Sequence, residues 1–472
     1  MPSIPLLNWD ILLLIIPLLE PAWVDIKEVQ SIVHLMQTCR TLYGAGMPYL
    51  LRSPDYSAFS IKSAIAFNEF VLRDSKRPQF IRSMQIPDYW RAEHNSALTR
   101  SLAGVLAAAK DLEAITFDEA EPFFADSFLL QAAVATHRNL KTISLSGCGD
   151  RTVEAILELQ SPVTSIKVDF GFESRFYQEG EADIARILSN ISQHLEAVDI
   201  VSVGILNSDT LFPRTTTLTF REVDHLNVDA IIHSFPNVRV FSWNSSNWPE
   251  ENFTLEDVEG MRSQTRNNDW PSLDYLDATI PRCYALHLKR PVRIWDVYLD
   301  ANWLSCFPST LRDIRPPRLT MCLNLGEWTI ETLSKLLQML CSINVTHLHF
   351  DLCIDCKSIL PLQTEQDTIV DRLGALPHLT FTSLAIHGLV VSPAIAPGPA
   401  DVYFTEMNYE SYAGRFASFP KLEHLSFRIS NWPAVNFVWE VRRDLSAEGG
   451  NVMVKLGREE HKWFRGFFDP CY

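Results

Sequence analysis

The chain has 472 residues, of which 47% are hydrophobic and 21% are charged, and this composition excludes a mainly disordered protein. Asp and Glu total 57 against 41 for Lys and Arg, which gives a formal net charge of −16. A negative field opposes phosphate backbones and anionic lipid, so we expect neither nucleic acid nor a membrane surface among the partners.

Cysteine usage and the N-terminal apolar run both indicate an intracellular protein. Nine cysteines are spread over the chain without regular spacing, which is typical of reduced thiols rather than of a disulfide framework. The apolar run 11–19 is shorter than the about 20 residues that span a bilayer. No Lys or Arg precedes Lys27, so we expect no secretory signal. These features predict a cytoplasmic or nuclear address.

The first 75 residues carry the pattern of short helices. Asn8 can cap a first helix, which Pro17 ends or kinks. Asp25 can cap a second helix, and Gly44 and Gly46 are expected to stop the helical segment that follows it. The apolar residues at helical spacing in the second helix are Ile26, Val29, Ile32, Val33, Leu35 and Met36.

A spaced set of residues in this segment follows the pattern of a known helical module. The set comprises, in order, Pro5, Asp10-Ile11-Leu12, Asp25-Ile26 and Cys39-Arg40-x-x-Tyr43. It resembles the F-box, which docks cullin–RING ubiquitin ligases through the Skp adaptor. The resemblance implies that the adaptor-binding residues are Pro5, Leu7, Ile11, Leu12, Ile15, Ile26, Leu35 and Cys39. The alternative is that these helices only cap the first repeat of the array that follows.

Residues 76–445 repeat one heptad, in which an apolar residue, two free positions, an apolar residue, one free position and a final apolar residue follow one another. The clearest copy is Leu140/Ile143/Leu145. Other copies are Ile81/Met84/Ile86, Leu112/Ile115/Phe117, Val163/Ile166/Val168, Leu195/Val198/Ile200, Val238/Phe241/Trp243, Leu273/Leu276/Ala278, Val292/Trp295/Val297, Val345/Leu348/Phe350, Phe381/Leu384/Ile386 and Leu422/Leu425/Phe427. The last two apolar residues leave a strand on one face. Strands this short must stack to bury that face, which predicts a solenoid.

Two units carry a further residue at a fixed distance. They are Leu140/Ile143/Leu145/Cys148 and Val345/Leu348/Phe350/Cys353. These units resemble leucine-rich repeats, and the resemblance implies an irregular α/β solenoid, with a curved parallel sheet and helices on its convex side. It also implies that the cysteine turns inward. The spacing of Cys353 and Cys356 would suit half of a zinc site, but no second pair lies nearby, so we favour a structural role for Cys353 and expect no metal.

Three stretches interrupt the repeats, at 171–181, 245–271 and 391–399, and we expect them to leave the solenoid as loops. Such loops are either recognition elements or decoration. Residues 446–472 form a tail dense in aromatic side chains. This tail is predicted to cap the last repeat, and a docking peptide is the alternative.

The free positions of the heptads predict the surface that reads a partner, because the resemblance places their third, fifth and seventh residues on the concave face. Early units offer mainly small polar residues there. Later units offer aromatic and charged ones, namely Tyr275, Asp277, Asp296, Tyr298, His347, His349, Asp351, His387, His424 and Arg428. Tyr and Arg are typical of binding hot spots, and clustered histidines would make the contact pH-sensitive. The alternative is that the histidines are ordinary solvated strand residues.

The sequence contains no phosphate-binding glycine loop, no G-x-S-x-G nucleophile elbow and no H-E-x-x-H helix. We therefore expect no enzyme and no cofactor. The implied function is that of a substrate-recognition subunit of a cullin–RING ubiquitin ligase, which binds the Skp adaptor and an unknown target protein. One alternative is a protein-interaction scaffold without any ligase. Another is an enzyme with its site on the concave face.

Overall fold

The structure is a computed structural model that divides into two compact units, Met1–Pro236 and Asn237–Tyr472. The residues that it describes are 13, 16, 26–54, 56–88, 96–171, 183–202, 209–223, 227–244, 254–265, 270–324, 328–340, 344–354, 378–388, 408–416, 419, 421–430, 435–443 and 451–455.

The first unit begins with helices and continues as repeats of a strand and a helical segment. Its helices are α2 (Ile26–Met36), α3 (Arg40–Leu50), α4 (Ile61–Leu72), α5 (Ser96–Ala108), α6 (Ala120–Asp126), α7 (Phe128–Ala135), α8 (Asp150–Leu157), α10 (Ile184–Ile187) and α11 (Val228–Ser234), with the 3-10 turns η1 (Tyr56–Ala58), η2 (Pro78–Phe80) and η4 (Ser189–Ile191). Its strands are β1 (Ser83–Ile86), β2 (Ala114–Phe117), β3 (Thr142–Leu145), β4 (Ser165–Asp169), β5 (Ala197–Val201) and β6 (Thr217–Arg221).

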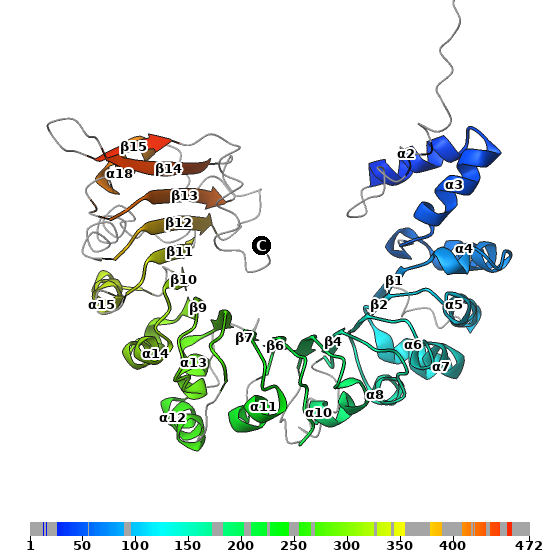
Figure 1. Ribbon diagram of the computed structural model, residues 1–472, viewed down its shortest axis with the longest axis horizontal. Helices are drawn as coiled ribbons and strands as arrows, with labels where there is room; N and C mark the ends of the chain where they lie inside the picture. Colours follow the sequence, from blue (N-terminus) through cyan, green and yellow to red (C-terminus); the bar gives the residue numbers. More distant parts are fainter. Residues whose placement is uncertain are drawn as a thin grey trace, which may run out of the picture. The chain divides into compact units, whose positions relative to one another are not determined.

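These strands form a parallel sheet in chain order, and the repeat helices of this unit lie on one of its faces (Figure 1). The register aligns the apolar heptad positions across the strands. One buried row is Met84, Ile115, Ile143, Ile166, Val198 and Leu218, and the next is Ile86, Phe117, Leu145, Val168, Ile200 and Phe220. The predicted α/β class and solenoid-like stacking are therefore confirmed, because each strand buries its apolar residues against its neighbours.

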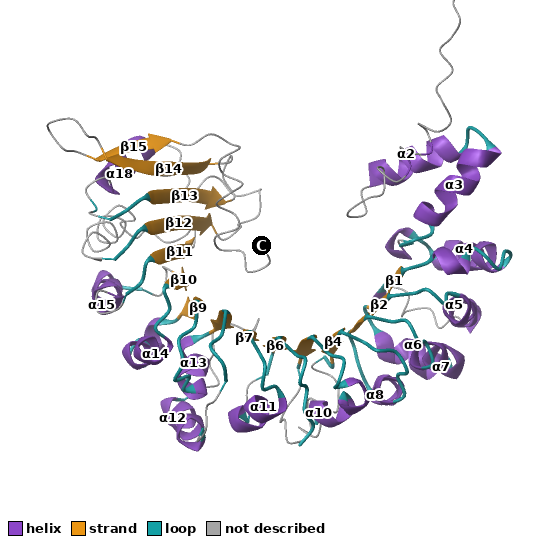
Figure 2. Cartoon of the chain, in the orientation of Figure 1, coloured by secondary structure: helices purple, strands orange, loops and turns teal. Residues whose placement is uncertain are grey.

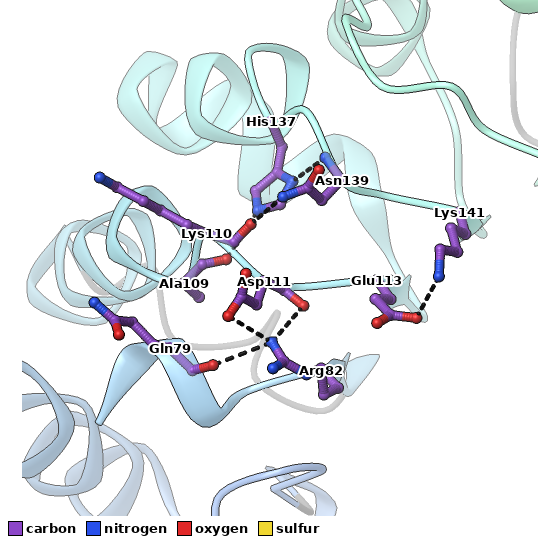
Figure 3. A network of polar contacts seen from close by, with 9 residues as sticks. All are labelled: Gln79, Arg82, Ala109, Lys110, Asp111, Glu113, His137, Asn139 and Lys141. Carbon is purple, nitrogen blue, oxygen red and sulfur yellow. Dashed lines mark hydrogen bonds and ion pairs between the residues drawn. The ribbon is translucent and has the colours of Figure 1, made fainter. Parts of the chain in front are cut away.

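Backbone hydrogen bonds join the repeats where each strand begins. At each junction, one backbone carbonyl oxygen accepts hydrogen bonds from two consecutive N–H groups of the next repeat. These carbonyl groups belong to Arg52, Arg82, Glu113, Lys141, Thr164 and Glu196. Side chains also connect neighbouring repeats (Figure 3). Asn139 Nδ2 donates to the Lys110 carbonyl over 2.7 Å, and Lys141 Nζ lies 2.9 Å from Glu113 Oε2. Because the ion pairs here are largely exposed, the backbone bonds contribute more to the stacking.

The second unit repeats the arrangement and then changes direction. Its strands are β7 (Val240–Asn244), β8 (Tyr275–Ala278), β9 (Ile294–Leu299), β10 (Arg318–Asn324), β11 (His347–Ile354), β12 (Phe381–Gly388), β13 (His424–Ser430), β14 (Val435–Arg443) and β15 (Asn451–Lys455). Its helices are α12 (Leu255–Gln264), α13 (Ile280–Leu286), α14 (Phe307–Ile314), α15 (Ile330–Leu340) and α18 (Tyr409–Phe416), with the turn η5 (Ala301–Trp303). Strands β7 to β13 pair in parallel, whereas β14 and β15 are antiparallel. In Figure 2, helices α12 to α15 lie on one side of the strands.

Two local expectations are wrong. Gly44 and Gly46 lie inside α3 and do not stop it. A Cβ at Gly46 would overlap the Met36 side chain, so this glycine permits close packing of α2 and α3. The stretch 245–271 contains helix α12, which begins with a capping box between Thr254 and Asp257.

The structure covers the other predicted interruptions and the C-terminal tail only in part. Stretch 391–399 lies outside the described residues, and so does most of 171–181. The tail 446–472 contains β15, which extends the sheet beyond β14. Within the described part of the chain, no helix is both long and apolar enough to span a bilayer.

Candidate partner-binding surfaces

The described part of the predicted adaptor-binding module is a packed pair of helices. Ile32 and Met36 of α2 are buried, and so is Leu42 of α3. Cys39 is the N-cap of α3, and its Sγ accepts a hydrogen bond from the Leu42 backbone N–H over 3.4 Å. Tyr43 is 43% exposed. The pair therefore joins a buried core to a partly apolar outer face.

The structure covers the predicted adaptor-binding residues only in part. Leu35 and Cys39 are half-buried, and Ile26 is the first residue of α2 with its side chain outside the description. The remaining predicted contacts lie outside the described residues; they are Pro5, Leu7, Ile11, Leu12 and Ile15.

The sheet face that points away from the helices is called the open face below. Strand alternation places the free heptad positions on it, because neighbouring side chains point to opposite faces. In β9, for example, Trp295 and Val297 are fully buried, whereas Asp296 and Tyr298 are half-buried. The same alternation places Tyr275 and the other predicted partner-binding residues of β8 and β11 on the open face of the second unit.

Two carboxylates meet on this face at the centre of β8 and β9. Asp277 is in register with Asp296, and neighbouring strands are about 4.8 Å apart. Asp277 Oδ2 accepts hydrogen bonds from Ser242 Oγ, over 3.0 Å, and from Asn244 Nδ2. Asp296 Oδ2 accepts one from the Tyr275 hydroxyl over 3.2 Å. The two carboxyl groups therefore differ in the hydrogen-bond donors that contact them.

The environment of Asp296 favours its neutral form. Burial, joined by the charges of Asp277 and Asp351, raises the pKa of Asp296 to about 7 against the opposing hydrogen bond from Tyr275. The heptad pattern predicted that these residues share a face, but it did not predict a neutral carboxyl group among them.

Two of the predicted histidines, His347 and His424, lie at one edge of the same face, where their strands begin. Arg318 is in register with His347, which is in register with Phe381, and Phe381 is in register with His424. Burial, together with the charges of Arg318 and His424, lowers the pKa of His347 to about 4. His347 is therefore uncharged near neutral pH. A change in its charge does not make partner contact sensitive to pH in that range.

The remaining predicted residues lie further along the sheet. His349 is aligned with Thr320, and Asp351 with Cys322. His387 is in β12 and Arg428 is in β13, with side chains outside the description. Among the described residues, no group of three or more His, Cys, Asp or Glu side chains could hold a metal ion.

Three strands have heptads that the sequence pattern did not reveal or placed wrongly. In β6 the first apolar position is Thr215, whose buried hydroxyl donates to the Leu195 carbonyl over 2.9 Å. In β10 that position is Pro316, which is buried. In β12 the second position is the buried Thr382, so the correct heptad is two residues earlier than predicted. Polar residues and proline in core positions hid these strands.

The missed strands carry charges on the open face. In the first unit, Asp199 of β5 forms an ion pair with Arg221 of β6 and is in register with Lys167 of β4. Burial raises the pKa of Asp199, while the charges of Arg221 and Lys167 oppose the shift. In the second unit, Arg318 of β10 is in register with Ile294 of β9 and His347 of β11. In β6 and β10, the alternation of apolar and polar residues was the sequence signal that could have revealed the strands.

The family and sequence comparisons yield no relative from which a role for these surfaces could be transferred. No protein-family model matches the chain, and no curated protein matches its sequence. A role for these surfaces is therefore inferred from their residues and geometry.

Proposed function

We propose that this protein is the substrate-recognition subunit of a cullin–RING ubiquitin ligase, with the N-terminal helices binding the Skp adaptor and the open face of the repeats binding a target protein. The observation that carries this proposal is the order of its parts. A short pair of packed helices, with the Cys39-Arg40-x-x-Tyr43 pattern at the start of α3, precedes a parallel α/β repeat sheet, and helix α4 lies between them. This order resembles an F-box followed by leucine-rich repeats.

The proposed role requires no chemistry from this chain. A receptor of this kind raises the effective concentration of its target beside a ubiquitin-conjugating enzyme that is held elsewhere in the assembly. We therefore propose a non-enzymatic protein that works without a cofactor in the cytoplasm or nucleus, where the ligase machinery operates.

Binding of the recombinant Skp adaptor to the full chain tests the proposal. We expect the unmodified chain to co-elute with the adaptor in size-exclusion chromatography. Leu12→Asp should abolish co-elution, because placing a charge against an apolar partner surface costs on the order of several kcal/mol. Leu157→Asp is the matched control, since Leu157 is 43% exposed on α8, and this variant should bind normally.

The outcome separates the alternatives. Failure of the folded, unmodified chain to bind the adaptor would reject the ligase role and leave an interaction scaffold. Equal loss of binding in both variants would show that the substitutions act through misfolding rather than through the interface.

A further inference from the structure

The pairing of Asp277 with Asp296 has a consequence that is independent of any partner. Both side chains project from the open face at register positions of adjacent parallel strands. Two carboxylates this close do not both ionise readily, because each charge disfavours the other. Whether one of them keeps a proton depends on how the surrounding groups stabilise each charge.

Hydrogen bonding distinguishes the two acids. Asp277 Oδ2 has two donors, Ser242 Oγ and Asn244 Nδ2, and donors to a carboxylate favour its charged form. Asp296 has one described donor, the Tyr275 hydroxyl at 3.2 Å. Asp277 is therefore the acid better suited to carry the charge, and Asp296 is the one better suited to stay protonated.

The other groups around Asp296 do not restore its charge. Its register partner in β10 is Thr320, which is uncharged. The titratable and charged side chains that face this position among the described residues are Tyr275 and Asp277 in β8, Tyr298 in β9, Arg318 and Cys322 in β10, and His349 and Asp351 in β11. None of the described charges that shift Asp296 belongs to a cation, and the charge of Asp351 adds to that of Asp277.

We propose that the Asp277–Asp296 pair holds one proton on Asp296 in the folded protein, and that this proton is released to solvent as the pH rises through the near-neutral range. The open face of the second unit then becomes more negative by one charge as the pH rises through this range. Burial supports the assignment, since it is the largest cause that raises the pKa of Asp296 to about 7. The inference goes beyond the proposed ligase role and does not depend on it.

The direct test is a titration of the folded, full-length chain labelled with carbon-13 at the aspartate carboxyl groups. We expect one carboxyl signal to titrate near pH 7, far above the ordinary aspartate value of about 3.9. This signal should be missing from Asp296→Asn, which assigns it. Asp274→Asn is the matched control, because Asp274 is exposed just before β8, and it should leave the signal in place.

A second variant tests the coupling. Asp277→Asn removes the neighbouring charge but keeps a side chain of the same size, so the Asp296 signal should titrate at a clearly lower pH. The proposal is overturned if every aspartate of the unmodified chain titrates below about pH 5, or if Asp277→Asn leaves the titration of the Asp296 signal unchanged.

Stability provides a readout that depends on the same proton. The folded chain keeps the proton up to about pH 7, whereas the unfolded chain loses it near pH 4. Between these values the contribution of Asp296 to stability falls as the pH rises, by up to about tenfold in the unfolding equilibrium per pH unit. The ratio of the unfolding constants of unmodified chain and Asp296→Asn should change with this slope, and a constant ratio would contradict the proposal.

Discussion

His347 shows how strongly its position on the open face can shift the pKa of a side chain. Its Nδ1 lies 2.9 Å from Thr346 Oγ1, and burial, with smaller electrostatic effects of Arg318 and His424, lowers the pKa of its imidazole to about 4. A histidine of ordinary pKa would gain charge at about pH 6.5. The folded chain therefore keeps His347 neutral under conditions in which the unfolded chain protonates it.

This shift predicts a loss of stability on the acid side. Between about pH 6.5 and about pH 4 the unfolded state binds the additional proton, so the contribution of His347 to stability decreases as the pH falls through this window. We expect His347→Gln, which cannot be protonated, to remove this acid-side loss from the curve of unfolding free energy against pH. Urea unfolding at successive pH values measures the effect, and an unchanged slope would contradict it.

Asp296 acts in the opposite direction over much of the same range, because its folded form retains a proton that the unfolded chain has lost. The two contributions partly cancel in the unmodified chain. Asp296→Asn should therefore reveal a steeper acid-side loss, and His347→Gln a steeper loss towards neutral pH. Only the pair of variants resolves both groups.

At the scale of single elements, α8 depends on a carboxylate from the preceding repeat. Its N-cap is Gly149, which has no side chain to offer. Glu121 of α6 supplies the acceptors instead, with Oε1 bound to the Arg151 N–H at 3.0 Å and Oε2 to the Thr152 N–H at 2.9 Å. The Thr152 hydroxyl also donates to Oε2. One side chain thus satisfies helix donors that a local cap would satisfy elsewhere.

Glu121→Ala should destabilise the first unit by about 1–2 kcal/mol, because the donors at the start of α8 lose their acceptor. Gly149→Ala should cost a similar amount, although the backbone of Gly149 suits any residue, because the new Cβ would lie 2.6 Å from Glu121 Cδ. The double variant should cost no more than either single one. Chemical denaturation checks all three, and strict additivity would contradict the shared mechanism.

Glu158→Ala is the matched control for these variants. Glu158 is the exposed C-cap of the same helix, where a negative charge opposes the helix dipole. Its replacement should leave stability unchanged or slightly higher.

At the scale of the whole molecule, the two units present different open faces. Among its described residues, the first carries mostly small polar side chains, with a group of charges that includes Lys167, Asp169, Asp199 and Arg221. The second carries the acidic pair, the tyrosines and the histidines. Aromatic side chains with a polar tip contribute much of the binding energy at interfaces, so we expect the second unit to recognise the target.

Replacing Tyr298, His347 and His349 together with Ala tests this expectation. The variant should retain its fold and its adaptor binding while losing the target from affinity purifications read by mass spectrometry. The control replaces Thr116, Thr142 and Ser144 with Ala, which alters the same number of open-face positions in the first unit and should keep the target. A folded variant of the second unit with an unchanged set of partners would reject the expectation.

The amino-acid sequence by itself determined which residues of most repeat strands are buried and that the strands stack against one another. A period of two between Ile143 and Leu145 puts both on one face, and no four-residue strand can bury that face without a neighbour. The prediction failed where Thr215, Pro316 and Thr382 occupy core positions, because a pattern of aliphatic and aromatic residues does not detect a buried hydroxyl group or a buried proline.

Only the tertiary structure decided which open-face residues meet and what charge they carry. Asp277 and Asp296 become neighbours through strand register, and Glu121 reaches α8 across a turn of the solenoid. The backbone hydrogen bonds between repeats determine which of these residues become neighbours. The strand register in turn depends on the length and packing of the segments between two strands. The proton on Asp296 follows from the same cause, since a pKa depends on burial and on neighbouring charges that no local pattern encodes.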